Sequence, residues 1–301
     1  MSVSRSHTAL IYGEFDPLAD TRPIRVLRPR RSRKPLVITI GLIISLLIAI
    51  YLFLPTRTNT LILGIDRALE GTYLARTDTM ILTTIIPLKP YVGMLSIPRD
   101  LWVQLPDGGF NRINTAHFFA ENVEPGTGPE AAKEVVMQNF GVDVHYFIRF
   151  EFEGFKDFID ELGGIPLTLE EPAAGYAPGE YVLDGEQALA FVRDRLGTDD
   201  FFRMSHGQLF LKSMVKQMIN PMNWFRLLKA MPTLITAVDT DLPLWLWPRM
   251  GLALLRAGPD GMDLRSISRE MVQGFTTDQG AQVLAPDWYI INPVLLEMFG
   301  Q

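Results

Sequence analysis

The stretch "TMILTTIIPLKPYVGMLSIPRD", Thr79 to Asp100, contains two short apolar runs and ends in a charged pair. The runs "TMILTTII" and "YVGMLSIP" are bounded by prolines and rich in β-branched residues, which predicts two strands. Similar runs predict three further strands, at "NTLILGID", "VHYFIRFEF" and "IPLTLE". Arg99 and Asp100 follow the second run and a proline directly, so they stand at a strand end.

Segments with helical periodicity alternate with these strands: "PEAAKEVVMQNF", "EGFKDFIDEL", "DGEQALAFVR" and "FFRMSHGQLFLKSMVKQMI". Strands interleaved with helices predict an α/β sandwich with a mixed sheet. Beyond Asn220 the chain is expected to be mostly helical, with one strand at "MDLRSISRE". Because no long linker divides residues 60–301, we expect residues 55–301 to form one domain.

The segment "LVITIGLIISLLIAIYLFL", Leu36 to Leu54, has nineteen residues and no charge. As a helix it would rise about 28 Å, close to the roughly 30 Å of a bilayer's hydrocarbon core. It is therefore predicted to be an N-terminal transmembrane helix over residues 36–54. A cleaved signal peptide is the alternative, but the following "FLPTRTNT" lacks a small-residue cleavage site, which favours a retained anchor.

Charge predicts the orientation of this anchor. Residues 1–35 hold eight Lys or Arg against three acidic residues, and positive flanks stay in the cytoplasm. A basic tail over 1–35 is thus expected to be cytoplasmic and residues 55–301 extracytoplasmic, in a single-pass protein of the cell membrane. Nucleic-acid binding is the other interpretation of the tail, and its position beside the membrane argues against it. Beyond Pro35 there are 20 basic and 31 acidic residues, a net charge of −11.

Several chemistries are missing from the sequence. There is no cysteine, which excludes disulfides, thiolate nucleophiles and zinc ribbons. There is no GxSxG, phosphate-loop or HExxH motif, and the four histidines lie far apart. Any metal site must therefore use carboxylates, which favours hard ions such as magnesium or manganese.

Polar residues stand at the ends of the predicted strands at three places. Asp66 ends "LGID", Arg76 and Asp78 lie two apart in "ARTDTM", and Arg99 and Asp100 end "SIPRD". Each cluster alone is typical of a turn or a solvated strand end. Open α/β sheets bind ligands where strands end, however, so clusters that meet at one edge would form a site.

The stretch "FVRDRLGTDDFFR" concentrates opposed charge between Phe191 and Arg203. Arg193 and Arg195 are two apart, so they share a side only if the chain is extended there. We predict that one helix ends at Arg193 and the next begins near Asp200, with both arginines turned toward a pyrophosphate. Arginine forks suit phosphate oxygens and carboxylates suit a divalent metal. A salt-bridged loop is the alternative.

Eight motifs in order give the chain a family resemblance. The sequences "LILGID", "ARTDTMILTTI", "GMLSIPRD", "RINTA", "YFIRFEFEGF", "ELGGIPL", "LDGEQALAFVRDR" and "DDFFR" resemble those of the LytR–CpsA–Psr family of bacterial envelope proteins. The resemblance implies a mixed central sheet flanked by helices on both sides, with a hydrophobic pocket for a polyprenyl chain. It also implies a phosphotransferase that moves a glycan phosphate from a polyprenyl-pyrophosphate carrier to peptidoglycan or another envelope acceptor.

The resemblance assigns roles to residues of this chain. Asp66 and Asp78 match the family's metal-binding aspartates, which implies Mg²⁺ or Mn²⁺. The residues implied to contact the pyrophosphate are Arg76, Arg99, Arg193, Arg195, Arg203 and Gln208. Those implied to be catalytic are Asp78, Arg99, Asp100 and Arg203, and Asn114 matches a further motif position. The general base is left open among Asp78, Asp100 and Asp200.

The chain departs from the family after "DDFFR". His206 and Gly207 stand where the family has an arginine and a glutamine, and Phe202 stands where a glycine is usual. We assign His206 no chemical role, since a lone helical histidine is more often structural. Farther on, Leu242 to Gly258 is too broken by prolines for a second span, and its tryptophans suggest contact with a membrane surface.

Two alternatives to the metal-dependent transferase remain. One is a protein of the same fold that holds a polyprenyl lipid to regulate envelope synthesis without turnover. The other is a pyrophosphatase that hydrolyses the pyrophosphate of the carrier with water as nucleophile. All three need the arginines. Only an enzyme needs a metal-assembled site, so the presence of both Asp66 and Asp78 favours the enzyme.

Overall fold

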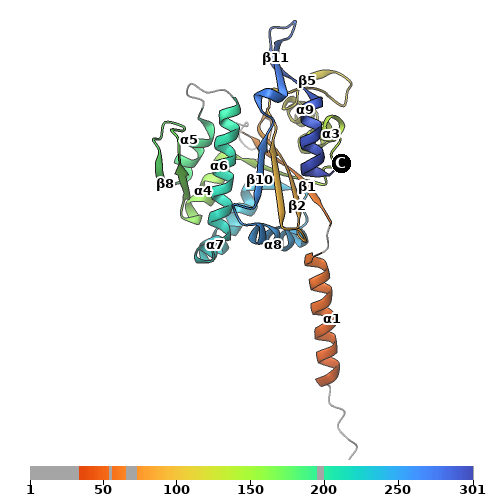
Figure 1. Ribbon diagram of the computed structural model, residues 1–301, viewed down its shortest axis with the longest axis vertical. Coiled ribbons are helices and arrows are strands. Elements are labelled where there is room, and N and C mark those ends of the chain that lie inside the picture. Colours follow the sequence, from red (N-terminus) through yellow and green to blue (C-terminus); the bar gives the residue numbers. More distant parts are fainter. Residues whose placement is uncertain (1–33, 54–55, 66–72, 195–199, 301) are drawn as a thin grey trace, which may run out of the picture. The chain divides into compact units, whose positions relative to one another are not determined.

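The computed structural model describes residues 34–53, 56–65, 73–194 and 200–300, and its centre is a six-stranded sheet (Figure 1). The strand order is β10-β3-β2-β1-β6-β9. Strand β1 runs antiparallel to β2 and parallel to β6, so the sheet is mixed, as predicted. The strands are β1 (Thr58–Ile65), β2 (Thr77–Ile86), β3 (Tyr91–Ser96), β6 (Tyr146–Glu151), β9 (Val238–Thr240) and β10 (Met262–Ser266).

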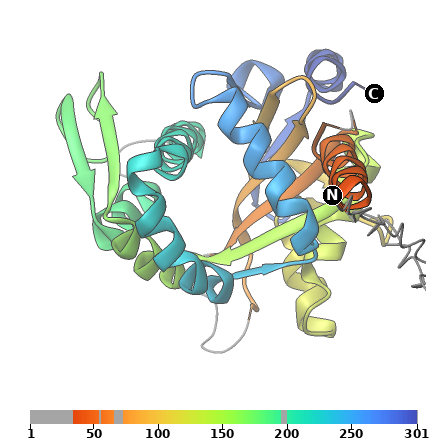
Figure 2. The ribbon, with the colours of Figure 1, turned by 90° about the horizontal axis from the view of Figure 1, so that it is seen from below.

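Both faces of the sheet are covered by helices (Figure 2). Successive side chains of a strand point to opposite faces. Leu61 and Leu82 pack in a core with α3 (Gly128–Phe140) and α9 (Trp288–Phe299). Their neighbours Ile62 and Ile81 belong to a second core, with α6 (Asp200–Ile219) and α8 (Trp247–Ala257). Helices on both sides of a mixed sheet are therefore confirmed.

A third core lies beside the sheet. It is built from α4 (Phe152–Leu162), α5 (Gly185–Arg193), α6 and α7 (Trp224–Ala237), together with β7 (Ile165–Leu169) and β8 (Gly179–Leu183). The predicted strand "IPLTLE" is β7, but it pairs only with β8 in a separate ribbon. Gly163 and Gly164, both at positive φ, end α4 and turn the chain into that ribbon.

The remaining elements are short. They are α2 (Thr115–Val123), the ribbons β4 (Trp102–Gln104) with β5 (Phe110–Arg112) and β11 (Val272–Thr276) with β12 (Gln282–Pro286), and three 3₁₀ turns, η1 (Pro221–Asn223), η2 (Leu244–Leu246) and η3 (Arg269–Met271). The predicted strand in "MDLRSISRE" is β10. The strands β11 and β12 lie in a region that we expected to be mostly helical.

The predicted helix boundaries around "FVRDRLGTDDFFR" are confirmed. Helix α5 begins with a capping box between Asp184 and Gln187 and ends at Arg193, and α6 begins at Asp200. The intervening residues 195–199, which include Arg195, lie outside the described residues.

The apolar segment near the N-terminus forms helix α1 (Lys34–Phe53). Among the residues that the structure describes, no helix is long and apolar enough to cross a membrane. The chain divides into two compact units, Met1–Leu46 and Leu47–Gln301.

Candidate functional site

A long apolar pocket lies between one face of the sheet and helices α4 to α8. Its volume is about 370 Å³, and it follows β2 and α6. Asp78 and Arg203 line it at the beginnings of these two elements, and Ile85 and Met218 line it near their ends. Among its described lining residues only Asp78, Arg99 and Arg203 are charged. The pocket therefore has one charged end and a long apolar remainder.

Two arginines hold Asp78 at the charged end. Arg99 donates a hydrogen bond from Nη1 to Asp78 Oδ1, and Arg203 donates from Nη2 to the Asp78 carbonyl oxygen at 2.9 Å. Arg203 Nη1 lies 4.0 Å from Asp78 Oδ1. The Arg203 side chain is only 10% exposed, which favours strong, directional contacts with an anion. The structure thus brings together residues from β2, from the end of β3 and from α6.

Asp100 extends this cluster with a second carboxylate. Its Oδ2 lies 3.5 Å from Arg99 Nε, and its Oδ1 lies 3.1 Å from Arg112 Nε. Arg112 Nη2 also donates to the carbonyl of Gln282, 2.8 Å away. Arg112 was missed as a site residue, although it opens the motif "RINTA". Carboxylates and guanidiniums alternate along this row, so each arginine is oriented before any substrate arrives.

Other predicted site residues lie outside the pocket lining. Arg76 is exposed, and Arg193 is half-buried in the last turn of α5. Asn114 is buried before α2, and no hydrogen-bond partner for its Oδ1 lies among the described residues. Gln208 donates from Nε2 to Ser96 Oγ at 3.0 Å and to a carbonyl of β10, so its amide ties α6 to the sheet. These bonds give Gln208 a structural role, and its contact with the pyrophosphate stays a prediction.

The predicted metal ligands are only partly described. Asp66 lies outside the described residues, as does the side chain of Asp200. In the described part of the chain no group of three His, Asp or Glu residues is placed to hold a metal. The register pairs Ile65 with Thr77, and these residues directly precede Asp66 and Asp78 in the sequence. The metal site with Asp66 stays a prediction.

A buried ionic network supports the segment that leads into Asp78. Arg149 of β6 is 2% exposed and pairs with Glu121 at 3.0 Å and with Asp239. Its guanidinium carbon lies 3.8 Å from the centre of the Tyr73 ring. His117 Nδ1 lies 3.0 Å from the carbonyl oxygen of Ala75. The network therefore holds residues 73–75, which directly precede Arg76 and Asp78.

This network was not predicted from the sequence. Its signals are an arginine within the apolar run "VHYFIRFEF" and the pair His117 and Glu121, which lie four residues apart on one helix. Burial lowers the pKa of His117, so the ring is neutral at neutral pH. Burial alone would raise the pKa of Glu121, but the N–H groups of Gly126 and Gly128, with Arg149, outweigh it and lower that pKa.

The residues that depart from the family motifs, Phe202, His206 and Gly207, all lie in α6. The His206 ring lies 5.2 Å from the Phe191 ring, and burial lowers the pKa of His206. Gly207 lines the pocket, and a Cβ atom added there would meet nothing within 4 Å.

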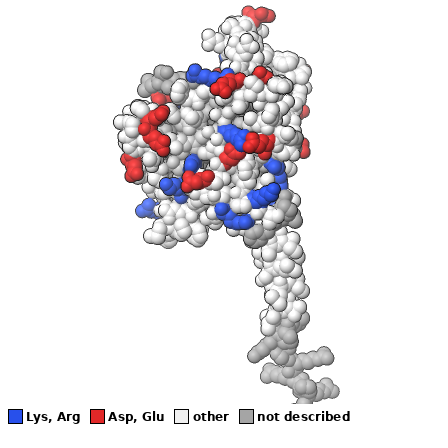
Figure 3. Space-filling view, in the orientation of Figure 1, with Lys and Arg blue, Asp and Glu red and all other residues white. Residues whose placement is uncertain are grey.

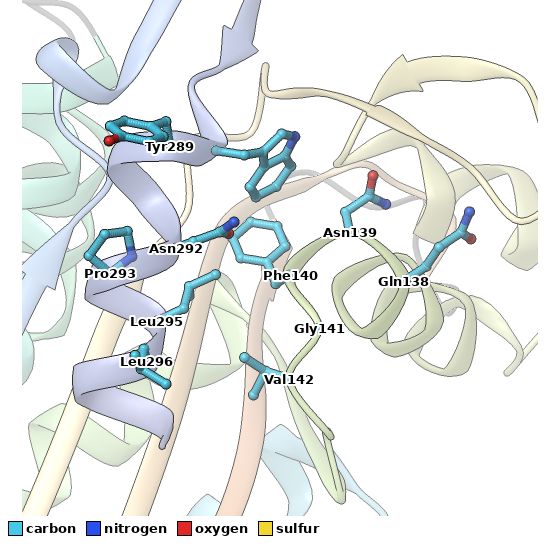
Figure 4. Close-up of a pocket in the computed structure, with 11 residues that line it drawn as sticks. Gln138, Asn139, Phe140, Gly141, Val142, Tyr289, Asn292, Pro293, Leu295 and Leu296 are labelled. Carbon is cyan, nitrogen blue, oxygen red and sulfur yellow. The ribbon is translucent and has the colours of Figure 1, made fainter. Parts of the chain in front are cut away.

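A second hollow lies between the end of α3 and α9 (Figure 4), and none of the described residues of the predicted site lines it. Its volume is about 710 Å³. Figure 4 shows Tyr289, Asn292 and Leu296 on α9 and Gln138 on α3. Its described lining contains no charged residue, so it lacks groups for phosphoryl chemistry.

A family model decides the relationship: the one described as the LytR_cpsA_psr family matches residues 55–288. The chain belongs to this family. It is 40% identical over 141 residues to the polyisoprenyl-teichoic acid–peptidoglycan teichoic acid transferase TagU of Oceanobacillus iheyensis, across 46% of this chain and 43% of TagU. It is 27% identical over 195 residues to the regulatory protein MsrR of Staphylococcus aureus, across 62% of this chain and 57% of MsrR. The matches span about half the length of these relatives.

Solved structures show the LytR_cpsA_psr fold. The crystal structure of TagV of B. subtilis has a TM-score of 0.67 at 24% identity and covers 82% of this chain and 98% of TagV. The structure of TagT bound to LIIa-WTA has a TM-score of 0.64 at 22% identity, across 81% of this chain and 91% of TagT. At these identities the likeness concerns the fold alone.

Proposed function

We propose that this chain is a membrane-anchored phosphotransferase that moves a glycan phosphate from a polyprenyl-pyrophosphate carrier to peptidoglycan or another envelope acceptor. The observation that carries the proposal is the pocket itself. Its apolar length suits a polyprenyl chain, and its single charged end, with Asp78, Arg99 and Arg203, suits a pyrophosphate. TagU, a relative at 40% identity, is named as a transferase of teichoic acid to peptidoglycan.

In the proposed reaction, an acceptor hydroxyl oxygen attacks the phosphorus that carries the glycan. The bond from this phosphorus to the bridging oxygen breaks, and polyprenyl phosphate leaves with the electron pair. Arg99 and Arg203 hold the two phosphates and neutralise the charge that develops on the leaving group. The hydroxyl proton passes to a carboxylate, for which Asp78, Asp100 and Asp200 are the candidates.

The proposal includes a divalent cation held by Asp66 and Asp78. Mg²⁺ or Mn²⁺ accepts one or two carboxylates plus phosphate oxygens, and when bound it would supply charge neutralisation at the phosphates.

The proposal also includes location. Residues 36–54 would span the cell membrane, with residues 1–35 in the cytoplasm and 55–301 outside, where peptidoglycan lies. Protease added to intact, wall-stripped cells should digest residues 60–301. Protection of those residues would contradict both the topology and the function.

A binding protein without turnover is the second candidate, because MsrR is named as a regulatory protein. Mass spectrometry of lipid extracted from the purified chain should detect a polyprenyl phosphate or pyrophosphate under either candidate. Arg193→Ala should then retain less lipid without a loss of stability. Extraction of no polyprenyl lipid from wild type, under conditions that preserve the fold, would contradict both.

A further inference from the structure

A surface at one end of the domain exposes large apolar side chains. Met222 in η1 is 86% exposed, and Phe225 and Leu228 in α7 are 82% and 72% exposed. In η2, Leu244 and Trp245 are 71% and 58% exposed. We call these five residues the α7–η2 face. Soluble surfaces rarely gather so many large apolar groups unless something covers them.

The inner side of α7 is already buried. Ala230 is fully buried, and Leu227 and Leu234 pack against the third core. Phe225 and Leu228 are three residues apart and share the opposite, outer side of the helix. Helix α7 is therefore apolar on two sides, and only one of them is needed for the fold.

The charge of the surrounding segments is opposite to that of the domain. Residues 220–238 and 242–259 contain no Asp or Glu and four Arg or Lys, whereas the chain beyond Pro35 carries a net charge of −11. Arg226 and Lys229 are exposed beside the apolar side chains. Figure 3 shows basic side chains toward the α7–α8 end of the domain on the face in view. Exposed apolar groups with basic neighbours fit the interface of a bilayer that contains anionic lipids.

The chain enters the domain at this same end. Arg249 of α8 donates from Nη2 to the Thr56 carbonyl oxygen at 2.8 Å, and Thr56 follows the last residue of α1 by three positions. Three residues reach at most about 11 Å. The rings of Tyr51 and Trp245, both in the unit Leu47–Gln301, are 6.1 Å apart. The last turn of helix α1 therefore lies next to Trp245 of the α7–η2 face.

The catalytic end of the pocket lies at the opposite end of the domain. Strand β1 begins at Thr58, opposite Ile85, and ends at Ile65, opposite Thr77, which precedes Asp78. The apolar end of the pocket is lined by Leu242, Trp247 and Leu254. Leu242 lies just before η2, and Trp247 and Leu254 lie in α8, which follows η2. From Arg203 to Met218, α6 rises about 22 Å.

We propose that the α7–η2 face rests in the headgroup region of the outer leaflet, so that the apolar end of the pocket lies beside the bilayer. A polyprenyl tail then keeps its inner end near the membrane, while Arg99 and Arg203 hold the pyrophosphate roughly 20 Å farther out, toward the wall. This rests on the proposed anchor and adds an orientation to it. The partner is the lipid surface itself, in preference to a second copy of the chain.

The absence of cysteine makes site-directed spin labelling direct. Phe225→Cys and Leu244→Cys report on the face, and Val123→Cys and Tyr289→Cys, 85% and 90% exposed in wild type, are matched controls elsewhere. The full-length chain is reconstituted into vesicles of equal parts phosphatidylcholine and phosphatidylglycerol. We expect the labels at 225 and 244 to be accessible to oxygen and shielded from an aqueous nickel complex, with the reverse at 123 and 289.

Equal nickel access at all four positions would overturn the inference. Spin–spin broadening at 225 that disappears on dilution with unlabelled chain, without oxygen access, would show a second copy on the face and would also overturn it. Flotation of every variant with the vesicles tests the anchor separately, and transfer in detergent tests the proposed function separately. A chain that floats and transfers but carries aqueous labels at 225 and 244 contradicts the orientation alone.

A functional readout uses Phe225→Ser combined with Leu244→Ser, neither of which lines the pocket. Losing two apolar anchors should lower transfer from a vesicle-borne donor by about tenfold or more, with transfer from a short-chain, micellar donor unchanged. An equal loss on both donors would indicate damage to the fold rather than lost contact with the membrane.

Discussion

Replacing Gly207 with leucine tests whether the pocket holds a lipid chain. Gly207 lies inside helix α6 and lines the pocket. A Cβ atom built there meets nothing within 4 Å, so a larger side chain extends into the cavity without a clash. The same change removes a glycine from a helix interior, which should stabilise the fold.

Gly207→Leu should therefore weaken lipid binding and raise the stability of the fold, and the size of each change can be estimated. Leucine adds four carbon atoms to the cavity and should exclude a similar number of lipid methylenes, each contributing about 0.8 kcal/mol to binding. The loss of about 3 kcal/mol corresponds to an affinity roughly a hundredfold lower. Removing the glycine should raise the free energy of unfolding by about 0.5–1 kcal/mol.

Calorimetric titration with a detergent-solubilised polyprenyl pyrophosphate measures the affinity, and denaturant unfolding measures the stability. Gly207→Ala is the matched control, because it gives the same helical gain but adds one carbon, so affinity should fall by only about fourfold. If Gly207→Leu binds the lipid like wild type, the lipid does not occupy this cavity. If it unfolds the domain, the space beside Gly207 is not open, and the description of the pocket is wrong.

Four further outcomes are expected. Arg203→Lys keeps the charge but loses the planar fork that reaches the Asp78 carbonyl, so transfer should fall by about tenfold or more at little cost in stability, measured by initial rates and thermal unfolding. Asp78→Asn should lower the rate of transfer far more than the free energy of unfolding. Wild-type transfer should vanish with chelator and return with magnesium or manganese. Survival of transfer after chelation would show that the arginines suffice. Burial lowers the pKa of His117 in the folded state, so below about pH 6.5 the unfolded chain binds more protons than the folded one. The free energy of unfolding should therefore fall as the pH drops below that value, and His117→Gln should flatten its dependence on pH. Glu121→Ala should lower the free energy of unfolding by about 3 kcal/mol, since it strips one carboxylate from the buried Arg149; an unchanged urea midpoint would contradict the role of that pair.

The parts of the fold that follow from local pattern were predictable. Leu61 and Ile62 alternate between two cores, and the capping residue Asp184 marks the start of α5. The sequence also predicted that α5 ends at Arg193 and that α6 begins at Asp200. Arg193 and Arg195 are two residues apart, a spacing that suits an extended chain and interrupts the helical pattern. Short ribbons such as β11 with β12 were missed, since five residues that include a glycine and exposed polar groups give little periodic signal.

Only part of the site followed from the sequence, and the roles of its residues stay predictions. The motifs singled out Asp78, Arg99 and Arg203, which the structure brings together. They did not indicate that Gln208 bonds to Ser96 and a β10 carbonyl, because that contact depends on how α6 packs across the sheet. The buried pair of Arg149 and Glu121 was missed for the same reason: it joins β6 to α2, and no local pattern encodes their approach.

The central claim is the transfer of a glycan phosphate to an acceptor hydroxyl. The most direct test incubates the full-length chain with a synthetic polyprenyl-pyrophosphate-linked glycan and peptidoglycan in ¹⁸O-labelled water, and follows both products by mass spectrometry. We expect polyprenyl phosphate to appear only when the acceptor is present, with the glycan phosphate covalently attached to peptidoglycan and no ¹⁸O in either product. Release without acceptor and with ¹⁸O incorporated would show hydrolysis, and binding of the donor without release under any metal would show a lipid-binding protein; either result would contradict the proposed function.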